Sequence, residues 1–438
     1  MRLVAGLSIL LGALACSNPA GAPPGSGKPD AGAGDAGSSG QAAQEPSCTK
    51  PAKAGEAFAV DPAHQTEIPG RVAFDGTLWL SYSHAADDGS ADFDVALTRL
   101  GCDGTVAMSP ETLSHAASSN DVDSTIALGA DRLLVAWSAD DHGDQPNLSL
   151  RYTELELDGS ALVPETALST TSGGEPASAN VWQPSVAPLP GGGFVVAGTR
   201  GIVGEPGGFR AFIQRIDAEG RPSGPTVDVP ASADSQSSMS NPALAKDPAG
   251  DLMLAWSAEP ASGAPTMQEA LLESNGTFFG PTTAVVGAGA GYGQYPSAGF
   301  APWAPRAFLA FEDDADSPST ILVKDAFAGG TAATLELQSP PGSLSTGPAV
   351  AVSKTGGAVA WFGENQTTGG RAILAQAFAF DGTSFTAGAQ VTVSGTGRVA
   401  PDAPTLAHVD GDLWFVAWAQ GTGSDLTMEG RFVELPQS

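Results

Sequence analysis

The chain has 438 residues, of which 42% are apolar and only 15% charged, and it contains 56 glycines and 34 prolines. This composition is sufficient for a large hydrophobic core interrupted by many turns. The net charge of −29 excludes a nucleic-acid-binding function, because phosphate contacts need clustered cations and the chain has only 19 Lys and Arg residues. It also argues against adhesion to an anionic membrane surface, and it favours solubility and, more weakly, cation binding.

Residues 1–16 have the features of a signal peptide. Arg2 supplies a positive flank, and the apolar run Leu3–Leu14 that follows is too short to span a bilayer. No later segment approaches 18 consecutive apolar residues, so the sequence predicts no transmembrane helix.

The end of this run resembles the lipobox of bacterial lipoproteins, in which the cysteine becomes an acylated N-terminus. Here the cysteine is Cys16, but Ala13 and Leu14 stand where that family usually has a leucine and a small residue. The alternative is ordinary secretion, since Ala13-Leu14-Ala15 also fits a small-x-small cleavage site. The resemblance implies a lipid on Cys16, and Ser17 is similar to the signal for sorting to the outer membrane. We therefore expect a cell-envelope lipoprotein of the outer membrane or an extracellular protein.

Residues 17–47 are dominated by Gly, Ala, Ser and Pro, and we expect them to form a disordered tether. Two further cysteines, Cys48 and Cys102, remain for the domain that follows. In an oxidising compartment two thiols predict one disulfide, and the alternative is a pair of unbonded thiols.

A four-residue phrase recurs seven times in residues 48–438, which predicts a repeat architecture. The phrases are Leu80–Ser83, Val135–Ser138, Val196–Thr199, Leu254–Ser257, Leu309–Glu312, Val359–Phe362 and Val416–Ala419. Their third residues are Tyr82, Trp137, Gly198, Trp256, Phe311, Trp361 and Trp418. We interpret these aromatic residues as packing between repeats rather than as a ligand-binding stripe.

Each repeat contains four short apolar runs separated by turn signals, and we name the expected strands A to D. In the sixth repeat they are Pro348–Val352, Ala358–Phe362, Arg371–Phe380 and Ala389–Val393. Asp-Gly and Gly-Gly pairs at the A–B and C–D turns supply the positive φ of two-residue hairpins. The phrase lies in strand B.

Seven units of four antiparallel strands, without helical periodicity, predict an all-β fold: a seven-bladed β-propeller. A linear solenoid would use shorter coils, and a row of sandwich domains would need roughly 100 residues each. The last repeat stops at a strand C, Arg431–Leu435, while Glu56–Val60 has the pattern of a lone strand D. We therefore expect this N-terminal strand to complete the C-terminal blade and remove a sheet edge. A Cys48–Cys102 bond would then fasten this closure to the next blade.

The D–A and B–C loops of a propeller share one face around the central channel, and we expect a ligand there. The polar and aromatic residues before the strands A are Glu67, Asp121, Asp123, Trp182, Gln183, Asn241, Gln294, Tyr295 and Asp402. Six of them are the candidate ligand residues: Glu67, Asp123, Trp182, Asn241, Tyr295 and Asp402. The aromatic residues among them offer flat apolar faces to a sugar or a peptide.

Pairs of carboxylates in three B–C loops are hard-oxygen ligands that suit Ca²⁺. These pairs are Asp87 and Asp88, Asp140 and Asp141, and Asp313 and Asp314. The alternative is a solvated acidic surface, because none of the loops matches the twelve-residue Ca²⁺ pattern. Ca²⁺ is thus a candidate ligand, and the sequence predicts no other cofactor.

Catalytic signatures are few. The five histidines are scattered, and the chain has no Gly-x-Ser-x-Gly elbow and no phosphate loop. Glu67 and Asp402 begin adjacent strands A, so paired carboxylates for glycoside cleavage stay open as an alternative. The hallmark boxes of sialidase propellers are absent.

The repeats resemble secreted bacterial β-propeller proteins over about Glu56–Leu435. That resemblance is specific for fold and uninformative for function. The prediction is a non-enzymatic, monomeric, lipid-anchored envelope protein that binds a protein or a glycan. The alternative is a carbohydrate-active enzyme, a glycosidase or a lyase, that works through the acidic channel mouth.

Overall fold

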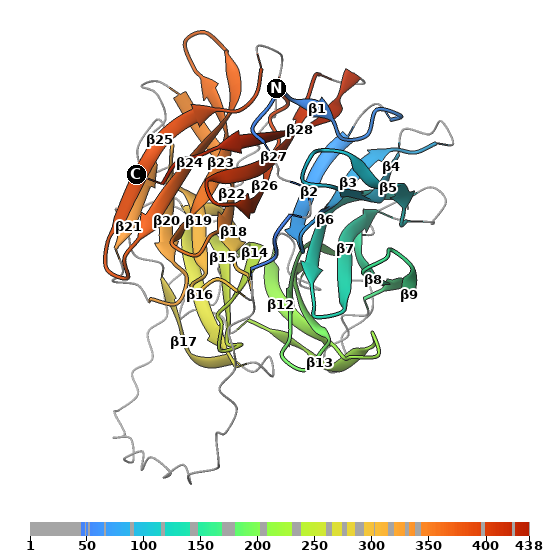
Figure 1. The fold of residues 1–438 in the computed structure, drawn as a ribbon. Helices are drawn as coiled ribbons and strands as arrows, with labels where there is room; N and C mark the ends of the chain where they lie inside the picture. Colours follow the sequence, from blue (N-terminus) through green and yellow to red (C-terminus); the bar gives the residue numbers. More distant parts are fainter. Residues whose placement is uncertain are drawn as a thin grey trace, which may run out of the picture. The chain divides into compact units, whose positions relative to one another are not determined.

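Every strand of the described chain belongs to one of seven four-stranded antiparallel sheets, and no helix accompanies them (Figure 1). The computed structural model describes residues 45–48, 50, 53–64, 67–87, 92–114, 119–140, 148–168, 180–201, 208–229, 238–259, 265–273, 278–284, 293–301, 303–313, 319–328, 333–337, 343–395, 399–422 and 425–437. These residues contain no helix long and apolar enough to cross a membrane. Residues 1–44, with Cys16 and most of the expected tether, lie outside the described part of the chain.

The two inner strands of each sheet carry the repeated sequence features. The strands A are β2 (Glu67–Phe74), β6 (Asn120–Leu128), β10 (Val181–Pro188), β14 (Ser238–Lys246), β18 (Gly293–Gly299), β22 (Ser343–Val352) and β26 (Thr405–Asp410). The strands B are β3 (Leu78–Ala85), β7 (Arg132–Asp140), β11 (Phe194–Gly201), β15 (Leu252–Glu259), β19 (Phe308–Asp313), β23 (Gly356–Asn365) and β27 (Leu413–Gln420). All seven phrases therefore lie in strands B, as predicted.

The outer strands complete each sheet. The strands C are β4 (Phe93–Leu100), β8 (Leu148–Glu156), β12 (Phe209–Ile216), β16 (Thr266–Leu272), β20 (Thr320–Asp325), β24 (Arg371–Phe380) and β28 (Thr427–Glu434). The strands D are β5 (Val106–Thr112), β9 (Ala161–Ala167), β13 (Pro222–Asp228), β17 (Phe278–Ala284), β21 (Thr334–Leu337), β25 (Phe385–Thr392) and β1 (Phe58–Ala59). The predicted seven-bladed propeller is confirmed, because neighbouring strands A contact one another around a closed circle.

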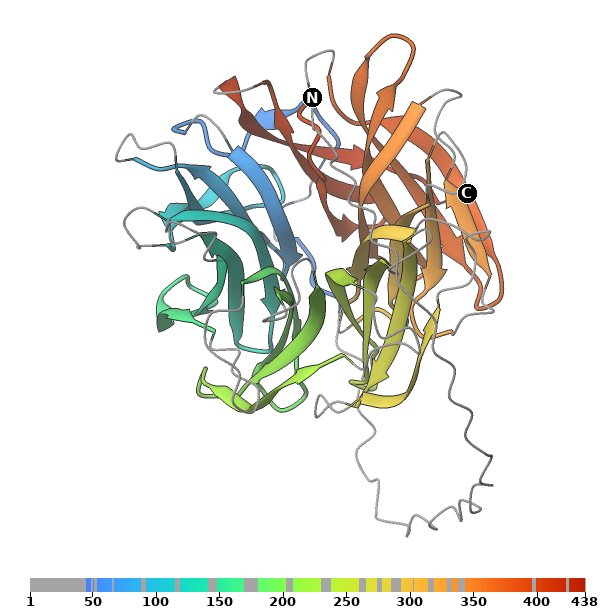
Figure 2. The same ribbon diagram turned by 180° about the vertical axis from the view of Figure 1, so that it is seen from behind.

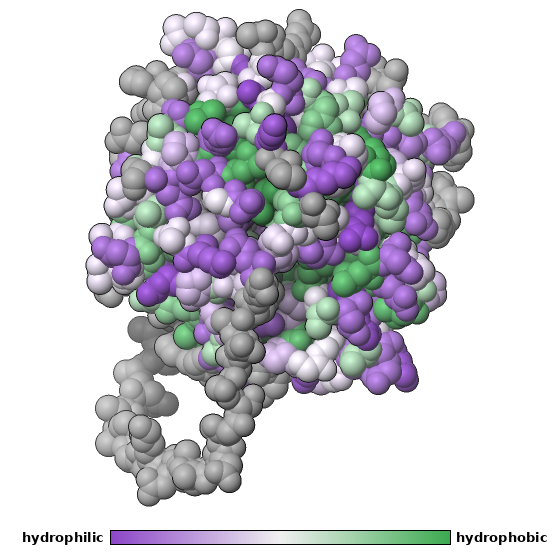
Figure 3. Space-filling view, viewed as in Figure 1, coloured by the Kyte–Doolittle hydropathy of each residue, from purple (hydrophilic) through white to green (hydrophobic). Residues whose placement is uncertain are grey.

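Burial falls from the inner strands to the outer ones. Strand B is buried along nearly its whole length, as in β7, because a neighbouring blade covers each of its two faces. Strand D alternates between exposed and half-buried residues, as in β5, because solvent covers the rim. Figure 3 accordingly shows a mostly hydrophilic surface broken by small apolar patches.

The aromatic residues of the phrases pack between blades, as predicted. Trp137, Trp256, Trp361 and Trp418 are each 0% exposed. In blade 3, Gly198 takes the aromatic place, and Phe212 of strand C fills the space instead. A Cβ at Gly198 would lie only 2.8 Å from the Phe212 ring.

Large and small side chains alternate where the blades converge on the axis. In six blades a large residue of strand A faces the preceding blade; these residues are Val72, Ile126, Val186, Leu244, Val350 and Leu406. The next residue along each of the seven strands is small; these residues are Ala73, Ala127, Ala187, Ala245, Gly299, Ala351 and Ala407. Val186 thus packs with Ala127, and Leu244 with Ala187, in shared apolar clusters. Only Ala or Gly leaves room for the large neighbour at this radius.

The ring closes between blade 7 and the N-terminal strand, as predicted, although β1 is shorter than the expected Glu56–Val60. β1 pairs with β28 through Phe58↔Gly430 and Ala59↔Glu429 (Figure 1). The Phe58 ring stacks on Phe432 with centroids 6.1 Å apart. Figure 2 shows the same closure from behind.

The predicted Cys48–Cys102 disulfide is present, with Cα atoms 5.9 Å apart. It joins the segment before β1 to the C–D turn of blade 1. The bond therefore fastens the closing segment to the blade that follows the closure.

Candidate functional site

A β-bulge interrupts the first half of strand A in six blades, and the residue that begins it often has a left-handed backbone. Asp123, Gln183, Asn241 and Tyr295 have φ between 51° and 56°, and Gly347 has φ of 60°. We call these five residues the bulge ring. A left-handed backbone costs a residue with a Cβ about 1–2 kcal/mol. Glycine would avoid this cost, and Gly347 shows that the fold accepts it there.

The bulge ring surrounds one end of the propeller axis. Each bulge lies toward the end of strand A that follows the D–A connection, and consecutive strands A contact each other around the axis. The left-handed side chains of four blades therefore gather at the channel mouth. All four were predicted from the sequence to lie on this face, and three of them, Asp123, Asn241 and Tyr295, are among the six candidate ligand residues.

Hydrogen bonds join the bulges of blades 3 and 4. The Gln183 amide donates to Asn241 Oδ1 at 2.6 Å, and Gln183 Oε1 accepts from the Asn241 backbone N–H at 2.9 Å. Thr199 also donates to Gln183 Oε1, at 3.0 Å. These two amide side chains are thus held in fixed positions at the mouth.

Two carboxyl groups and one guanidinium interact across the mouth near the ring closure. Asp123 is exposed within the mouth, yet desolvation by the surrounding wall raises the pKa of its carboxyl, the Arg71 guanidinium lowers it, and the Asp402 charge raises it again. Burial also raises the pKa of Asp402 and lowers that of Arg71. Displaced pKa values of interacting groups in a concave site favour hydrogen-bond donation or proton transfer by those groups.

The remaining predicted face residues have different surroundings. Tyr295 is 48% exposed, and half-buried Trp182 packs its ring edge-on to Phe209 with centroids 4.9 Å apart. Glu67 begins β2 opposite His84. The Glu67 side chain lies outside what the structure describes, so its pairing with Asp402 stays a prediction.

The predicted Ca²⁺ ligands are only half described. Asp87, Asp140 and Asp313 lie at or just beyond the ends of strands B, while Asp88, Asp141 and Asp314 fall outside the described residues. Asp87 lies 3.3 Å from the Nε2 atom of His64. Within the described ranges no three His, Cys, Asp or Glu side chains are grouped as metal ligands. Ca²⁺ binding stays a prediction.

An axial cavity of about 420 Å³ extends from the bulges to the A–B turns, and the sequence did not predict it. The strands A of all seven blades line it. Residues at its bulge end include Arg71 and Ser185, and Lys246, Trp303 and His408 lie at the other end.

The segment Glu45–Cys48 crosses that other end, and we call it the strap. Glu45 lies 2.8 Å from Lys354 Nζ in blade 6 and 2.9 Å from His408 Nδ1 in blade 7. Pro46 lines the cavity, and Cys48 is bonded to Cys102 in blade 1. The strap thus ties three blades together beside the cavity.

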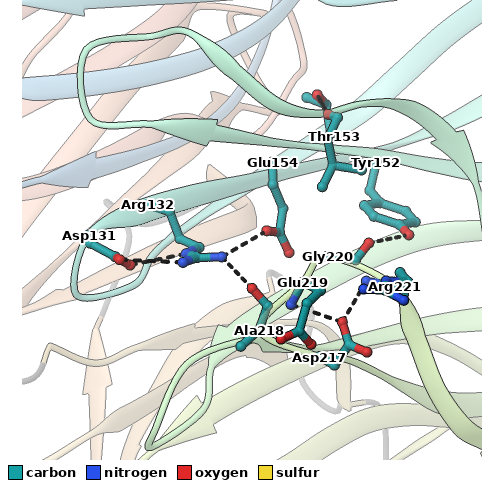
Figure 4. A network of polar contacts seen from close by, with 11 residues as sticks. Asp131, Arg132, Tyr152, Thr153, Glu154, Asp217, Ala218, Glu219, Gly220 and Arg221 are labelled. Atoms are coloured by element: carbon teal, nitrogen blue, oxygen red, sulfur yellow. Dashed lines mark hydrogen bonds and ion pairs between the residues drawn. The ribbon is translucent and has the colours of Figure 1, made fainter.

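A separate polar network lies between blades 2 and 3, away from the predicted face (Figure 4). Its centre is Glu154, which is 0% exposed and lies 3.6 Å from Arg132 Nη1. Arg132 also donates to the Ala218 carbonyl, and Tyr152 donates to the Gly220 carbonyl (Figure 4). Burial raises the pKa of Glu154 to about 6, in spite of the Arg132 charge. This network joins blades, and its charged groups do not reach the channel mouth.

Comparison with known proteins supports the fold and goes no further. No family model and no curated protein matches the chain. A Dyadobacter fermentans protein of unknown function is similar in structure, with a TM-score of 0.53 and 12% identity over 88% of this chain and 99% of that one. The polysaccharide lyase Uly1 has a TM-score of 0.50 and 11% identity over 86% of this chain and 91% of that one. At such identities the likeness shows the fold alone. The protein is a seven-bladed β-propeller with a polar mouth and an axial cavity.

Proposed function

We propose that the protein is a glycan-binding module whose site is the channel mouth. The observation that carries the proposal is the bulge ring, in which four blades retain Asp, Gln, Asn and Tyr side chains at a backbone geometry that favours glycine. Strained positions concentrated at a concave mouth are typical of a binding site rather than of packing.

The chemistry of the ring favours a sugar over a protein partner. Exposed Tyr295 and half-buried Trp182 present flat apolar faces, and the amides of Gln183 and Asn241 are fixed by their mutual hydrogen bonds. Sugars are bound by aromatic faces combined with a few oriented polar groups inside a concavity. A protein partner would need a broader surface than the mouth of a channel.

The proposal also includes the cellular location of the protein. A lipid on Cys16 would anchor the chain in the cell envelope, with residues 17–47 as a spacer and a monomeric propeller as the binding domain. Mass spectrometry of the mature protein tests this directly. We expect an acylated Cys16 at the N-terminus, and an unmodified Cys16 there would contradict it.

The test of binding uses the purified full chain on an array of bacterial and plant glycans. Tyr295→Gly removes the aromatic face without adding backbone strain, so we expect it to weaken any positive glycan by about tenfold or more. Leu162→Ala, at an exposed position of strand D, is the matched control and leaves binding unchanged. A wild-type protein that binds no glycan, or a Tyr295→Gly variant with full affinity, would contradict the proposal.

A second candidate function is cleavage of the bound glycan, and the raised pKa values of Asp123 and Asp402 favour it. A carboxyl that keeps its proton closer to neutral pH can act as a general acid while another group acts as base. Product analysis after incubation with each bound glycan decides between the two functions. If cleavage occurs, Asp123→Asn lowers its rate by about 10²–10⁴ while binding persists. If wild-type protein releases no product, the module is non-enzymatic.

A further inference from the structure

Arg71 breaks the sevenfold repeat at a position where every other blade has a small residue. This position follows the bulge and faces the second residue of the phrase in strand B. Its other occupants are Thr125, Ser185, Ala243, Ser297, Ala349 and Thr405, and all seven residues line the axial cavity. Blades converge too closely here for a long side chain to fit between them, so the arginine extends along the cavity.

The guanidinium of Arg71 has no hydrogen bond or ion pair with any residue in the described ranges. Its backbone is fixed to Ser81 by hydrogen bonds of 3.3 and 3.4 Å, and Asp123 provides only a longer-range attraction. The Arg71 side chain is half-buried at the cavity wall, and desolvation lowers the pKa of the guanidinium. The five N–H donors of the guanidinium therefore have no protein acceptor at the cavity wall and are available to an anion that enters the cavity.

Hydroxyl groups surround the same level of the cavity. Ser185 Oγ accepts the Leu244 backbone N–H at 3.0 Å, and Ser297 Oγ accepts that of Val350 at 3.3 Å. Because these oxygens already accept, their hydroxyl protons are left to donate toward the cavity. Below this level the cavity wall is formed mainly by alanine and other apolar side chains, which would strengthen a charge interaction by excluding water.

We infer that Arg71 binds the carboxylate of an acidic sugar whose chain enters the axial cavity from the bulge ring. The planar guanidinium matches a carboxylate with two parallel hydrogen bonds, which a hydroxyl of a neutral sugar cannot provide. The inference rests on the proposed function and narrows its substrate class to uronic-acid glycans. The cavity volume of about 420 Å³ lies within the range of small-molecule sites.

Isothermal titration with two matched probes tests the inference. The probes are galacturonic acid trisaccharide and the same trisaccharide with its carboxyl groups reduced to alcohols. We expect wild-type protein to bind the acidic probe at least about tenfold more tightly than the reduced one. In Arg71→Ser this preference should disappear, because the guanidinium that pairs with the carboxylate is gone. Serine is the chosen replacement because it occupies the equivalent positions 185 and 297.

Arg215→Ser is the matched control, because it removes the same charge from an exposed position of strand C. It should keep the preference for the acidic probe. Thermal melting checks folding, and Arg71→Ser should be at least as stable as wild type because it removes an unpaired charge.

Three outcomes would overturn the inference. The first is equal affinity of the wild-type protein for both probes, and the second is an unchanged preference of Arg71→Ser for the acidic probe. Either result contradicts the role of Arg71 but not glycan binding at the mouth. Failure of wild type to bind either probe also removes it. The proposed function itself falls only if the array contains no positive glycan or if Tyr295→Gly keeps full affinity.

Discussion

Glu45 Oε1 lies 2.9 Å from His408 Nδ1, so a residue that precedes the first strand is bound to the last strand A of the propeller. The other nitrogen of this ring, Nε2, lies 2.9 Å from the Gly411 carbonyl oxygen. Both nitrogens of the His408 ring thus lie near oxygen atoms of other residues. This contact joins the strap to blade 7 at the end of the axis where the A–B turns lie, whereas β1 joins blade 7 by pairing with β28.

Glu45→Gln should therefore loosen the strap. The substitution removes the carboxylate charge that lies beside Lys354 and His408, and we expect it to lower the free energy of unfolding by about 1–2 kcal/mol. Urea denaturation followed by tryptophan fluorescence measures this change. Glu56→Gln, at an exposed residue between the strap and β1, removes an equal charge and should have no effect. Equal stabilities of the two variants would show that the strap adds nothing to closure.

Reduction of the Cys48–Cys102 bond should destabilise the propeller more strongly. The bond closes a loop with a sequence separation of 54, which predicts a loss of about 4 kcal/mol in the chain-entropy account. Denaturation midpoints with and without a reductant give the value. The double variant Cys48→Ser, Cys102→Ser should have the denaturation midpoint of the reduced protein, and the reductant should not change that midpoint. If the reductant still shifts the midpoint of the double variant, the destabilisation does not come from loss of this disulfide.

Glu154 should make stability depend on pH. Burial raises its pKa in the folded state to about 6, above the ordinary value of 4.5. The folded state therefore holds this proton more tightly than the unfolded state, and the stabilisation present below pH 4.5 is lost as the pH rises through about 6. Glu154→Gln removes this dependence, so its stability relative to wild type should increase by on the order of 1 kcal/mol between pH 4.5 and 7. A constant difference across this range would contradict the assignment.

Tyr295→Gly should separate stability from binding. Relief of the left-handed backbone at φ 51° offsets the loss of an exposed ring, and we expect the melting temperature to stay the same or rise. Glycan affinity should fall in the same variant, as argued for the bulge ring. A large drop in melting temperature would instead make Tyr295 a structural residue.

Gly299→Ala tests the crowding of the blades at the axis. A Cβ at this position would lie 2.6 Å from the Val350 carbonyl oxygen in the next blade, so the backbone must shift. The expected loss of stability is about 1–3 kcal/mol, measured by chemical denaturation. Gly395→Ala is the matched control, since nothing lies within 4 Å of its added Cβ. A neutral Gly299→Ala would show that the axis can widen.

Several features of the fold could be predicted because they depend on local patterns. The phrase with Trp137 and its equivalents recurs in each strand B, and Asp-Gly pairs mark the hairpins. Strand C of the sixth repeat, Arg371–Phe380, was predicted to the residue. The Cys48–Cys102 bond followed from counting cysteines and from the expected closure. The length of β1 was overestimated, because an isolated strand has no repeat to define its ends.

The candidate site was predicted only in part. Asp123, Asn241 and Tyr295 could be found because each follows a D–A connection, whereas the left-handed bulge that joins them has no distinct sequence signal. Gln183, which stands between Trp182 and a proline, was predicted to lie on this face but was not among the six candidate ligand residues. Arg71 was also missed, since an arginine two residues into a strand gains meaning only when the equivalent residues of six other blades are aligned.

The sequence by itself determined the number of blades, the order of strands and the place of closure, because the spacing of apolar runs and turns depends on neighbouring residues alone. Only the tertiary structure decided which residues share the axis. Strands A from seven distant parts of the chain meet there, and their convergence turns Arg71 into an unpaired cation inside a cavity. It also brings the strap, more than 300 residues from His408 in sequence, against the opposite mouth.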